Sequence, residues 1–347
     1  MSAEYKALFE ASCATVFQAP FWLNAFYANL IDPYSLTPII ITIRDGDGLL
    51  LFLLPCVRQH SAGLKIVQSA DMGVSDYNCI IAREETLAMI SEDQELQRCI
   101  LEALNPFDVF FFRKQRSDKP KIEDILGGAT LSKADFHAHE VTLSSSFDSW
   151  ALDKLTAKFR SSNRRRMKNL IADHGEFQFS IAKDAEQIRA AMEFIRKQRS
   201  ARYKADILNQ PAFYNFYLSL ALDHAQDGCV QTSVIHLNGE IIAAFFGLNL
   251  DGTHCYILGG FLHEKYSKYS VGILAINATI ADRIDHRFKV FDFALGDESY
   301  KNDFGTDQIN IHNAVYTSTL AGYLVSHTYA HAKPLKNFLK KLNPKLH

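Results

Sequence analysis

Alternating apolar runs separated by short glycine turns give the first indication of the fold. Residues 37–44 and 49–58 are rich in apolar and β-branched side chains and flank an Asp-Gly-Asp-Gly turn. Residues 230–237 and 240–250 have the same character and flank an Asn-Gly turn, the strongest short signal for a β-hairpin. The pattern therefore predicts one hairpin in each half of the chain.

Each predicted hairpin is followed by a strand, a helix and a further strand in the same order. In the first half these are a strand at 79–81, a helix over 84–104 and a strand at 107–113. In the second half they are a strand at 254–261, a helix over 270–285 and a strand at 289–295. The repeated order, offset by roughly 180–190 positions, indicates a structural duplication, although ordinary alternation of strands and helices would produce the same order.

The length of 347 residues exceeds the usual size of one hydrophobic core, so two domains are expected. We place an N-terminal domain at 1–145, a C-terminal domain at 146–330 and a basic tail at 331–347. The C-terminal domain opens with a basic helical stretch over 148–173, and two further helices are expected within 184–227.

The composition is that of an ordinary folded protein. The formal net charge of −2 gives no electrostatic reason to expect DNA as a partner. Six cysteines without C-x-x-C spacing are typical of buried reduced thiols, and His137 with His139 on one face of a strand is too few ligands for a metal site. The first residues lack a signal-peptide pattern and no apolar run is long enough to span a bilayer. We therefore expect a soluble cytoplasmic protein without a metal.

The segment FDFALGDESYKNDFG at residues 291–305 carries the densest group of candidate catalytic residues. An apolar strand ends at Gly296 and is followed at once by Asp297, Tyr300 and Lys301. Polar residues that follow a buried strand are where α/β proteins commonly hold their sites. Asp297 and Lys301 are expected to position an acceptor or to pair with each other.

The predicted helix over 270–285 begins with Ser270, Val271 and Gly272, whose backbone N–H groups have no intrahelical acceptor. Such a helix end binds an anion, typically a phosphate, through its dipole and its N–H groups. Gly272 leaves room for a ligand to approach the backbone. The alternative is that Ser270 is only an N-cap and Gly272 only a packing residue.

A hairpin, a third strand, a helix with small residues at its N-terminus and another strand is the core order of the GNAT superfamily of N-acyltransferases, which this half of the sequence resembles. The resemblance implies an α/β fold of two tandem GNAT-like domains, with mixed central sheets flanked by helices and a degenerate N-terminal copy. It implies that the loop before helix 270–285 binds the pyrophosphate of coenzyme A, and that Tyr300 protonates the leaving thiolate. The same mechanism assigns polarisation of the thioester carbonyl to backbone N–H groups of strand 241–250, including Ala243 and Phe245.

Several motifs are similar to those of the CelD-like acetyltransferases of cellulose biosynthesis, which are related to the Fem-type aminoacyl transferases. They are the cluster Asp292-Phe293, Gly296-Asp297-Glu298 and Tyr300-Lys301, the Ser75-Asp76-Tyr77 loop, and the runs LPCVR, RRRMKNL and IRKQRSARY. The resemblance extends from about Phe17 to Tyr316. Tyr269-Ser270-Val271-Gly272 stands where these families commonly have Ser-Pro-Gly, and the Arg/Gln-x-x-Gly-x-Gly loop of typical GNAT enzymes is absent.

Two further pairs of residues are candidates for the acceptor site. Asp76 and Tyr77 are expected to contact an amine or hydroxyl of the substrate, and an Asx turn is the alternative for Asp76. Arg199 and Arg202, three positions apart on one predicted helix, are expected to bind a carboxylate or phosphate of the acceptor. The alternative for these arginines is an ion pair to the neighbouring sheet.

These inferences predict an enzyme that moves an acetyl or other acyl group from acetyl-CoA or another acyl-CoA to an amine or hydroxyl of a small molecule or saccharide. The attack is expected to be direct, without a covalent enzyme intermediate, and the family resemblance implies polysaccharide or envelope metabolism. Two alternatives stay open: a Fem-like transferase that uses aminoacyl-tRNA, and a non-catalytic binding protein of the same fold. The basic stretch KFRSSNRRRMKNL is interpreted as a solvated face or an anchor between domains, and RNA binding is expected only with an aminoacyl-tRNA donor.

Overall fold

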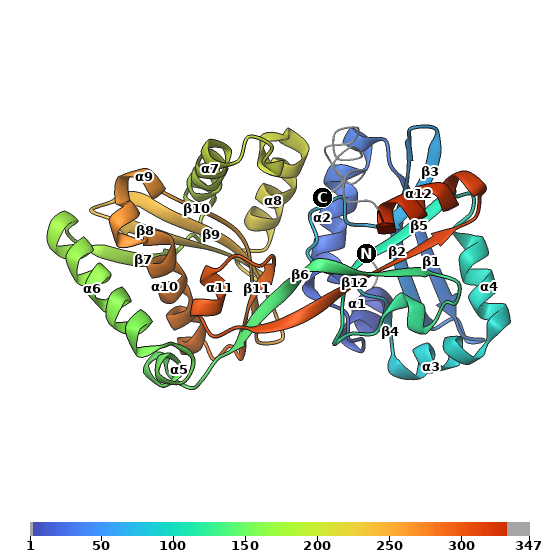
Figure 1. Cartoon of the computed structure of the whole chain (residues 1–347), viewed down its shortest axis with the longest axis horizontal. Coiled ribbons are helices and arrows are strands. Elements are labelled where there is room, and N and C mark those ends of the chain that lie inside the picture. The colour runs from blue at the N-terminus through green and yellow to red at the C-terminus, as the bar shows by residue number, and fades with distance from the viewer. Residues whose placement is uncertain (1–2, 332–347) are drawn as a thin grey trace. The chain divides into compact units, whose positions relative to one another are not determined.

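The computed structural model describes residues 3–331, which form two compact units of mixed α and β structure (Figure 1). The first unit runs from the N-terminus to His137 and resumes at Ile309, and the second comprises Ala138–Gln308. Two long strands, β6 (Thr130–Thr142) and β12 (Asp307–Thr317), carry the chain from one unit to the other. The second unit is therefore inserted into the sequence of the first.

The first unit is built on strands in the order β1-β2-β3-β5-β12. Their bounds are Thr37–Arg44 for β1, Leu50–Ser61 for β2, Leu64–Ser69 for β3 and Val109–Arg116 for β5, and the short β4 (Ile81–Ala82) pairs with β2. β1, β2 and β3 are successive antiparallel strands, β3 and β5 are parallel, and β5 and β12 are antiparallel. The hairpin predicted in the first half is confirmed as β1–β2.

Helices cover both faces of this sheet. They are α1 (Ala3–Glu10), α2 (Pro20–Leu30), α3 (Glu84–Glu92), α4 (Gln94–Ala103) and α12 (Leu320–His331). Ile90 of α3 and Ile100 of α4 pack with Phe110 of β5 in one core cluster, whereas Phe111 packs with Val325 of α12 in another. Successive residues of β5 thus serve opposite faces, as the pleat of a strand requires.

The second unit repeats the same pairing pattern, in the strand order β6-β11-β10-β9-β8-β7. The bounds are Phe177–Ile181 for β7, Val230–Leu237 for β8, Glu240–Leu250 for β9, Thr253–Phe261 for β10 and Val290–Leu295 for β11. β8, β9 and β10 are successive antiparallel strands, β10 and β11 are parallel, and β11 and β6 are antiparallel. The repeated order of elements in the sequence is therefore a repeat of sheet topology.

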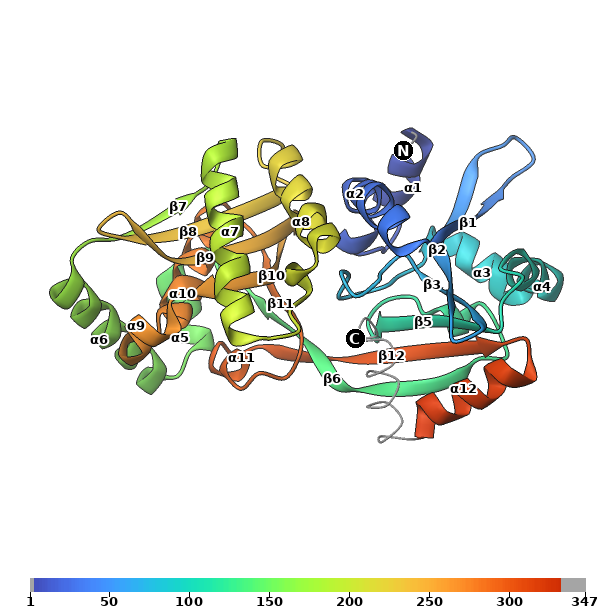
Figure 2. The same cartoon turned by 90° about the horizontal axis from the view of Figure 1, so that it is seen from above.

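Helices also pack on both faces of the second sheet (Figure 2). They are α5 (Phe147–Lys154), α6 (Ala157–His174), α7 (Ala185–Arg202), α8 (Pro211–Asp223), α9 (His263–Tyr266), α10 (Val271–Asp285) and α11 (Tyr300–Asp303). Phe245 of β9 shares a core cluster with Trp150 of α5 and Ile276 of α10. The next residue, Phe246, meets Tyr217 of α8 with ring centroids 5.4 Å apart, so α8 covers the opposite face.

Two predicted helices are each divided by a capping residue. The helix expected over 84–104 is α3 and α4, because Asp93 ends the first and caps the second through a side-chain hydrogen bond to the backbone. The helix expected over 148–173 is α5 and α6, and Thr156 caps α6 in the same way. Both side chains compete with the helical backbone for hydrogen bonds, which is why such residues favour helix ends.

The predicted limits of the two domains differ from the observed units at both boundaries: the second unit begins at Ala138 rather than at 146 and ends at Gln308 rather than at 330. Residues 309–331 belong to the first unit because β12 pairs with β5, with Val315 opposite Phe111. The third strand of the first unit is β3 rather than residues 79–81, only part of which lies in β4. The predicted tail lies, from residue 332, outside the described residues.

Cysteine placement follows the expectation in part. Cys56, Cys79 and Cys255 are buried, whereas Cys13 and Cys99 are exposed, and none of the six takes part in a disulfide within the described range. No helix of residues 3–331 combines the length and the apolar character needed to cross a bilayer.

Candidate active site

Strands β10 and β11 diverge in the second unit and leave one edge of β10 open. Parallel pairing joins residues 253–255 of β10 to residues 290–292 of β11 and ends there. Beyond this point β11 continues beside β6, while β10 runs on to Phe261. Alternate backbone N–H and C=O groups of residues 256–261 therefore face the side that β11 has left. An open edge of this kind can hydrogen-bond to the amides of a ligand.

Two successive glycines allow side chains and a helix to approach β10 closely. A Cβ on Gly260 would lie 2.8 Å from the Cα of Ile195, so glycine is needed where α7 meets the strand. A Cβ on Gly259 would collide with the hydroxyl of Tyr256 and the ring of Phe245. The absence of side chains here places the Tyr256 hydroxyl directly over the strand.

The N-terminus of α10 follows β10 after a short connection. Ser270 has a left-handed backbone (φ 52°, ψ 54°), and its hydroxyl forms no capping hydrogen bond in the described structure. Ser270 thus stands at the N-cap position, as the alternative expects, without a side-chain cap. The N–H groups of Val271 and Gly272 begin the helix and have no intrahelical acceptor, which is the arrangement that binds an anion.

Gly272 has a packing role as well as any role in binding. A Cβ at this position would lie 3.2 Å from the ring of Phe261, closer than most real contacts of this type. Glycine therefore lets the end of β10 pack against the first turn of α10. The predicted approach of a ligand to this glycine stays a prediction.

The backbone of β9 does not offer the N–H groups expected to polarise a thioester. β9 lies between β8 and β10, and Ala243 stands opposite Ile235 on one side and Phe261 on the other. Phe245 has the same two strands beside it. Both residues are thus engaged in the sheet, and the assignment of Ala243 and Phe245 to cofactor binding is corrected: the open backbone belongs to β10.

Tyr300 is the first residue of α11 and is half-buried, with its ring 6.4 Å from that of Phe293. Burial raises the pKa of the phenol, and the negative charges of Tyr256, Glu298 and Tyr203, where ionised, raise it further. The phenol therefore keeps its proton at neutral pH, which a general acid must do before the reaction.

Asp297 is tied to a buried histidine from another strand. Its Oδ1 lies 3.0 Å from Nε2 of His139 on β6, and the Asp297 side chain is 40% exposed. The imidazole is buried and its Nδ1 lies 2.9 Å from the hydroxyl of Thr306. His139 thus orients a carboxylate that still reaches solvent, which is the geometry of a positioned base.

Lys301 is buried at the turn after β11 and is bonded to groups of that turn. It is 2% exposed, and its Nζ lies 2.9 Å from the carbonyl oxygens of both Leu295 and Gly296 and 3.0 Å from Oε2 of Glu298. These acceptors use the three N–H donors of the ammonium group. The expected catalytic role of Lys301, and its expected pairing with Asp297, are therefore corrected to a structural role at the end of β11.

Arg199 forms an ion pair, as its alternative interpretation predicted, but with a neighbouring segment rather than with the sheet. Its Nη2 lies 2.7 Å from Oδ2 of Asp206, which is buried just after α7. The ion pair with Asp206 accounts for the position of the Arg199 side chain, so no substrate is needed to explain it.

Arg202 remains a candidate for binding an acceptor. It is exposed, and its guanidinium lies 5.1 Å from the ring centre of Tyr203 and 5.9 Å from that of Phe261. Its charge also acts to lower the pKa of Tyr300, so it lies within electrostatic reach of that phenol. Arg202, Phe261 and Tyr300 thus belong to one neighbourhood at the end of β10.

Asp76 and Tyr77 belong to the first unit. Tyr77 is a core residue, 2% exposed, with its ring 5.5 Å from Phe17 and beneath the guanidinium of Arg116 at 5.0 Å. Its expected substrate contact is corrected accordingly. Asp76 is partly exposed, and a substrate role for it stays a prediction. Nearby, Asp71 accepts a backbone hydrogen bond from the N–H of Gly73.

Helix α6 carries the basic stretch and buries a narrow face. Leu170 packs into the core, and Arg160 donates to backbone carbonyls at the end of α5, including that of Ala151. Arg164, Arg165 and Lys168 are exposed and form no ion pair among the described residues. These three side chains make the solvated face that the sequence predicts.

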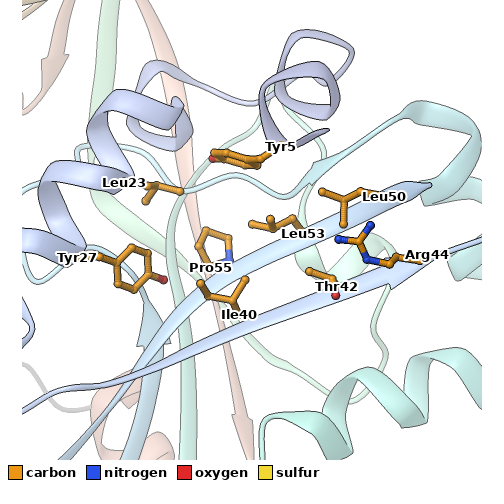
Figure 3. Close-up of a pocket in the computed structure, with 9 residues that line it drawn as sticks. All are labelled: Tyr5, Leu23, Tyr27, Ile40, Thr42, Arg44, Leu50, Leu53 and Pro55. Carbon is orange, nitrogen blue, oxygen red and sulfur yellow. The ribbon is translucent and has the colours of Figure 1, made fainter. Parts of the chain in front are cut away.

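A cavity of about 190 Å³ lies in the first unit, where α1 and α2 cover the β1–β2 hairpin (Figure 3). Its walls include Tyr5, Leu23, Tyr27, Ile40, Leu53 and Pro55. No residue predicted for the site lines it. Residues 3–331 contain no group of three or more His, Cys, Asp or Glu side chains able to hold a metal ion.

The divergent strands, the α10 N-terminus and Tyr300 all lie in a segment with a recognised family model. Residues 157–302 match the model of the acetyltransferase (GNAT) domain, so the second unit contains a GNAT-type acetyltransferase domain. His139 and Thr306 lie outside the matched residues. No local pattern in the sequence predicts the contact of His139 with Asp297 or that of Thr306 with His139. The alternation of His137 and His139 along one strand was the available signal, but it does not name a partner.

Solved structures extend the likeness over nearly the whole chain. FemX superposes with a TM-score of 0.64 at 11% identity, covering 93% of this chain and 97% of that one. L-PGS from Bacillus licheniformis superposes with a TM-score of 0.57 at 11% identity, covering 95% of this chain and 98% of that one. The C-terminal domain of a candidate lysylphosphatidylglycerol synthetase from Agrobacterium fabrum superposes with a TM-score of 0.56 at 11% identity, and 93% of each chain is covered. These likenesses confirm the predicted GNAT-like α/β fold. No curated protein sequence matches the chain.

Proposed function

We propose that the second unit transfers an acyl group from an acyl-CoA, most simply acetyl-CoA, to an amine or hydroxyl acceptor. The observation that carries the proposal is the open edge of β10 beside the N-terminus of α10, within the segment that matches the acetyltransferase (GNAT) domain. Coenzyme A has a pyrophosphate and a pantetheine arm with amide groups. The pyrophosphate suits the N–H groups of Val271 and Gly272, and the arm suits the free backbone of residues 256–261.

Transfer then proceeds by direct attack of the acceptor on the thioester carbonyl. The new C–N or C–O bond forms as the C–S bond breaks. Asp297, oriented by His139, takes the proton that the acceptor loses, directly or through water. Tyr300 gives its proton to the departing thiolate and regains one from solvent. Free N–H groups of β10, rather than those of β9, stabilise the oxygen of the carbonyl.

The acceptor is proposed to be a small molecule or a saccharide. The resemblance to CelD-like acetyltransferases, which rests on sequence motifs, favours polysaccharide or envelope metabolism. Arg202 is exposed beside Phe261 and within reach of Tyr300, so it is the residue of this neighbourhood suited to a negative group on the acceptor.

A second candidate is transfer from an aminoacyl-tRNA. FemX and the candidate lysylphosphatidylglycerol synthetase are among the structures with the same fold, and Arg164, Arg165 and Lys168 form an exposed cationic face on α6. Under this alternative these side chains would contact RNA phosphates. The net charge of −2 favours the acyl-CoA donor.

A binding comparison separates the two donors. Acetyl-CoA is titrated into the protein by calorimetry, and a panel of acyl-CoA donors is screened against amines and sugars with free thiol release as the readout. We expect saturable acetyl-CoA binding and no specific RNA binding near physiological salt. A salt-sensitive RNA complex that is lost in the Arg164→Ala/Arg165→Ala variant, with a log–log salt slope lower by roughly one per arginine removed, would favour the aminoacyl donor instead.

A further inference from the structure

Arg113 in the first unit carries a buried positive charge whose hydrogen bond among the described residues is to a neutral amide and not to a carboxylate. It lies on β5, is 7% exposed, and its guanidinium stands 5.4 Å from the ring centre of Phe111. Its hydrogen bond to the described protein runs from Nη2 to Oε1 of Gln68, a neutral amide, at 2.8 Å. A guanidinium has five N–H donors, so most of the donors of Arg113 lack a protein acceptor.

The buried carboxylate of the same cluster is already occupied. Asp71 accepts hydrogen bonds from Nζ of Lys114 at 3.1 Å, from the backbone N–H of Gly73 at 2.8 Å and from Nδ2 of Asn78 at 3.2 Å. Burial acts to raise the pKa of Asp71, but the charges of Lys114 and Arg113 outweigh burial and hold it below its usual value. Asp71 is therefore ionised and matched by Lys114, and Arg113 adds a second positive charge.

Arg116 on the same strand shows how this chain pairs a buried arginine. It is also 7% exposed, and its Nε and Nη2 donate to the two carboxylate oxygens of Asp118 at 3.0 and 2.9 Å. β5 thus holds two arginines of equal burial, of which Arg116 has a bidentate carboxylate and Arg113 has a single amide oxygen.

We propose that Arg113 is the anchor of a binding site for an oxyanion, the carboxylate or phosphate group of a ligand, in the first unit. Arg113 and Lys114 together face one carboxylate, that of Asp71, so an added oxyanion would balance the second positive charge. A planar guanidinium matches carboxylate and phosphate with two parallel hydrogen bonds. Gln68 and the Phe111 ring hold the guanidinium in one orientation. None of its nitrogens is among the fully buried side-chain atoms that lack a partner in the described structure, so its unpaired donors can be reached by a ligand. This site is independent of the acyl-donor site proposed for the second unit.

The first test measures anion binding by the intact chain. Thermal unfolding is followed in increasing inorganic phosphate or acetate, with sodium chloride added to keep the ionic strength constant. We expect a saturable rise of Tm with at least one of the two anions, because a ligand that binds only the folded state stabilises it. A response to phosphate alone or to acetate alone identifies the chemical group. No response to either anion overturns the proposal.

Matched variants then assign the site. Arg113→Met should abolish the response to the anion, measured against the Tm of the same variant in anion-free buffer, because it removes the proposed anchor. Arg116→Met should lower Tm, because it leaves Asp118 without its partner, and should keep the response. Arg113→Lys keeps the positive charge but cannot form two parallel hydrogen bonds as a planar guanidinium does. It should weaken anion binding by about tenfold or more. If Arg113→Met does not fold, the anion response of Arg113→Lys tests the assignment instead. Anion binding that is unchanged in Arg113→Met or Arg113→Lys overturns the assignment.

Discussion

His139 and Asp297 lie 158 positions apart in the sequence, yet Nε2 of the histidine and Oδ1 of the aspartate are 3.0 Å apart. The pair joins β6 to the turn after β11, because β6 and β11 are antiparallel neighbours at this end of the sheet. The contact thus fixes the turn that carries Tyr300.

The first prediction measures this contact. His139→Ala should lower the free energy of unfolding by about 1–3 kcal/mol, because Asp297 and Thr306 both lose a hydrogen-bond partner. Denaturant unfolding of His139→Ala, Asp297→Ala and the double variant forms a double-mutant cycle. We expect a coupling energy of about 0.5–3 kcal/mol. Additive effects would mean that the two side chains do not support each other in solution.

Tyr300→Phe should slow turnover and leave binding intact. The variant removes one hydroxyl from a half-buried ring, so folding should survive, and loss of a general acid typically costs about 10²–10⁴ in rate. The rate of thiol release and the affinity for acetyl-CoA are measured side by side. Tyr203→Phe is the control, since Tyr203 is 46% exposed and is given no role in proton transfer. Turnover of Tyr300→Phe within a few-fold of the wild type would exclude Tyr300 as the acid.

Two substitutions of Gly272 separate crowding from charge. Gly272→Ala forces the Phe261 ring to move by a fraction of an ångström and should change acetyl-CoA binding only modestly. Gly272→Glu adds a negative charge where phosphates are proposed to bind. It should abolish the thermal stabilisation by ligand, which is about 2.7 kcal/mol at a hundredfold excess over Kd. An undiminished shift in Gly272→Glu would place the donor elsewhere.

Removal of Lys301 should destabilise the second unit. Lys301→Met removes the donor to the part-buried carbonyl oxygens of Leu295 and Gly296, and each lost hydrogen bond costs about 0.5–1.5 kcal/mol. Lys265→Met is the control, because Lys265 pairs with Glu240 at the surface and such pairs are worth about 0–1 kcal/mol. Equal losses in urea unfolding would show that Lys301 does not hold the turn.

His254 should make stability depend on pH. Burial and the charge of Arg283 lower its pKa to about 3, from 6.5 in the unfolded chain. The unfolded state therefore binds the proton more readily, and the stability is fully present above pH 6.5 and is lost as pH falls towards 3. The slope is about 1.4 kcal/mol per pH unit. Between pH 6.5 and pH 4.5 the free energy of unfolding of the wild type should therefore fall more steeply than that of His254→Gln, with an additional slope that approaches about 1.4 kcal/mol per pH unit. Parallel pH profiles of the two proteins would contradict this.

The elements themselves were largely determined by the sequence. The Asn-Gly turn fixed the β8–β9 hairpin, because that dipeptide adopts the backbone twist that a two-residue hairpin needs, and Asn238 and Gly239 both have positive φ. Apolar residues at Ile276, Ile280 and Ile284 gave α10 its buried face. Such signals act over a few residues and need no knowledge of distant partners.

The tertiary structure decided which polar groups meet. Lys301 and Asp297 stand close in sequence, where they are predicted to position an acceptor or to pair with each other. In the structure Lys301 bonds to the carbonyl oxygens of Leu295 and Gly296, while Asp297 bonds to His139 on β6. Whether a backbone N–H is available to a ligand likewise depends on strand neighbours, so the free edge belongs to β10 and not to β9. The pairing of β12 with β5 was also decided by the tertiary structure. Pairing between strands far apart in the chain is set by the burial of whole sheet faces rather than by local sequence.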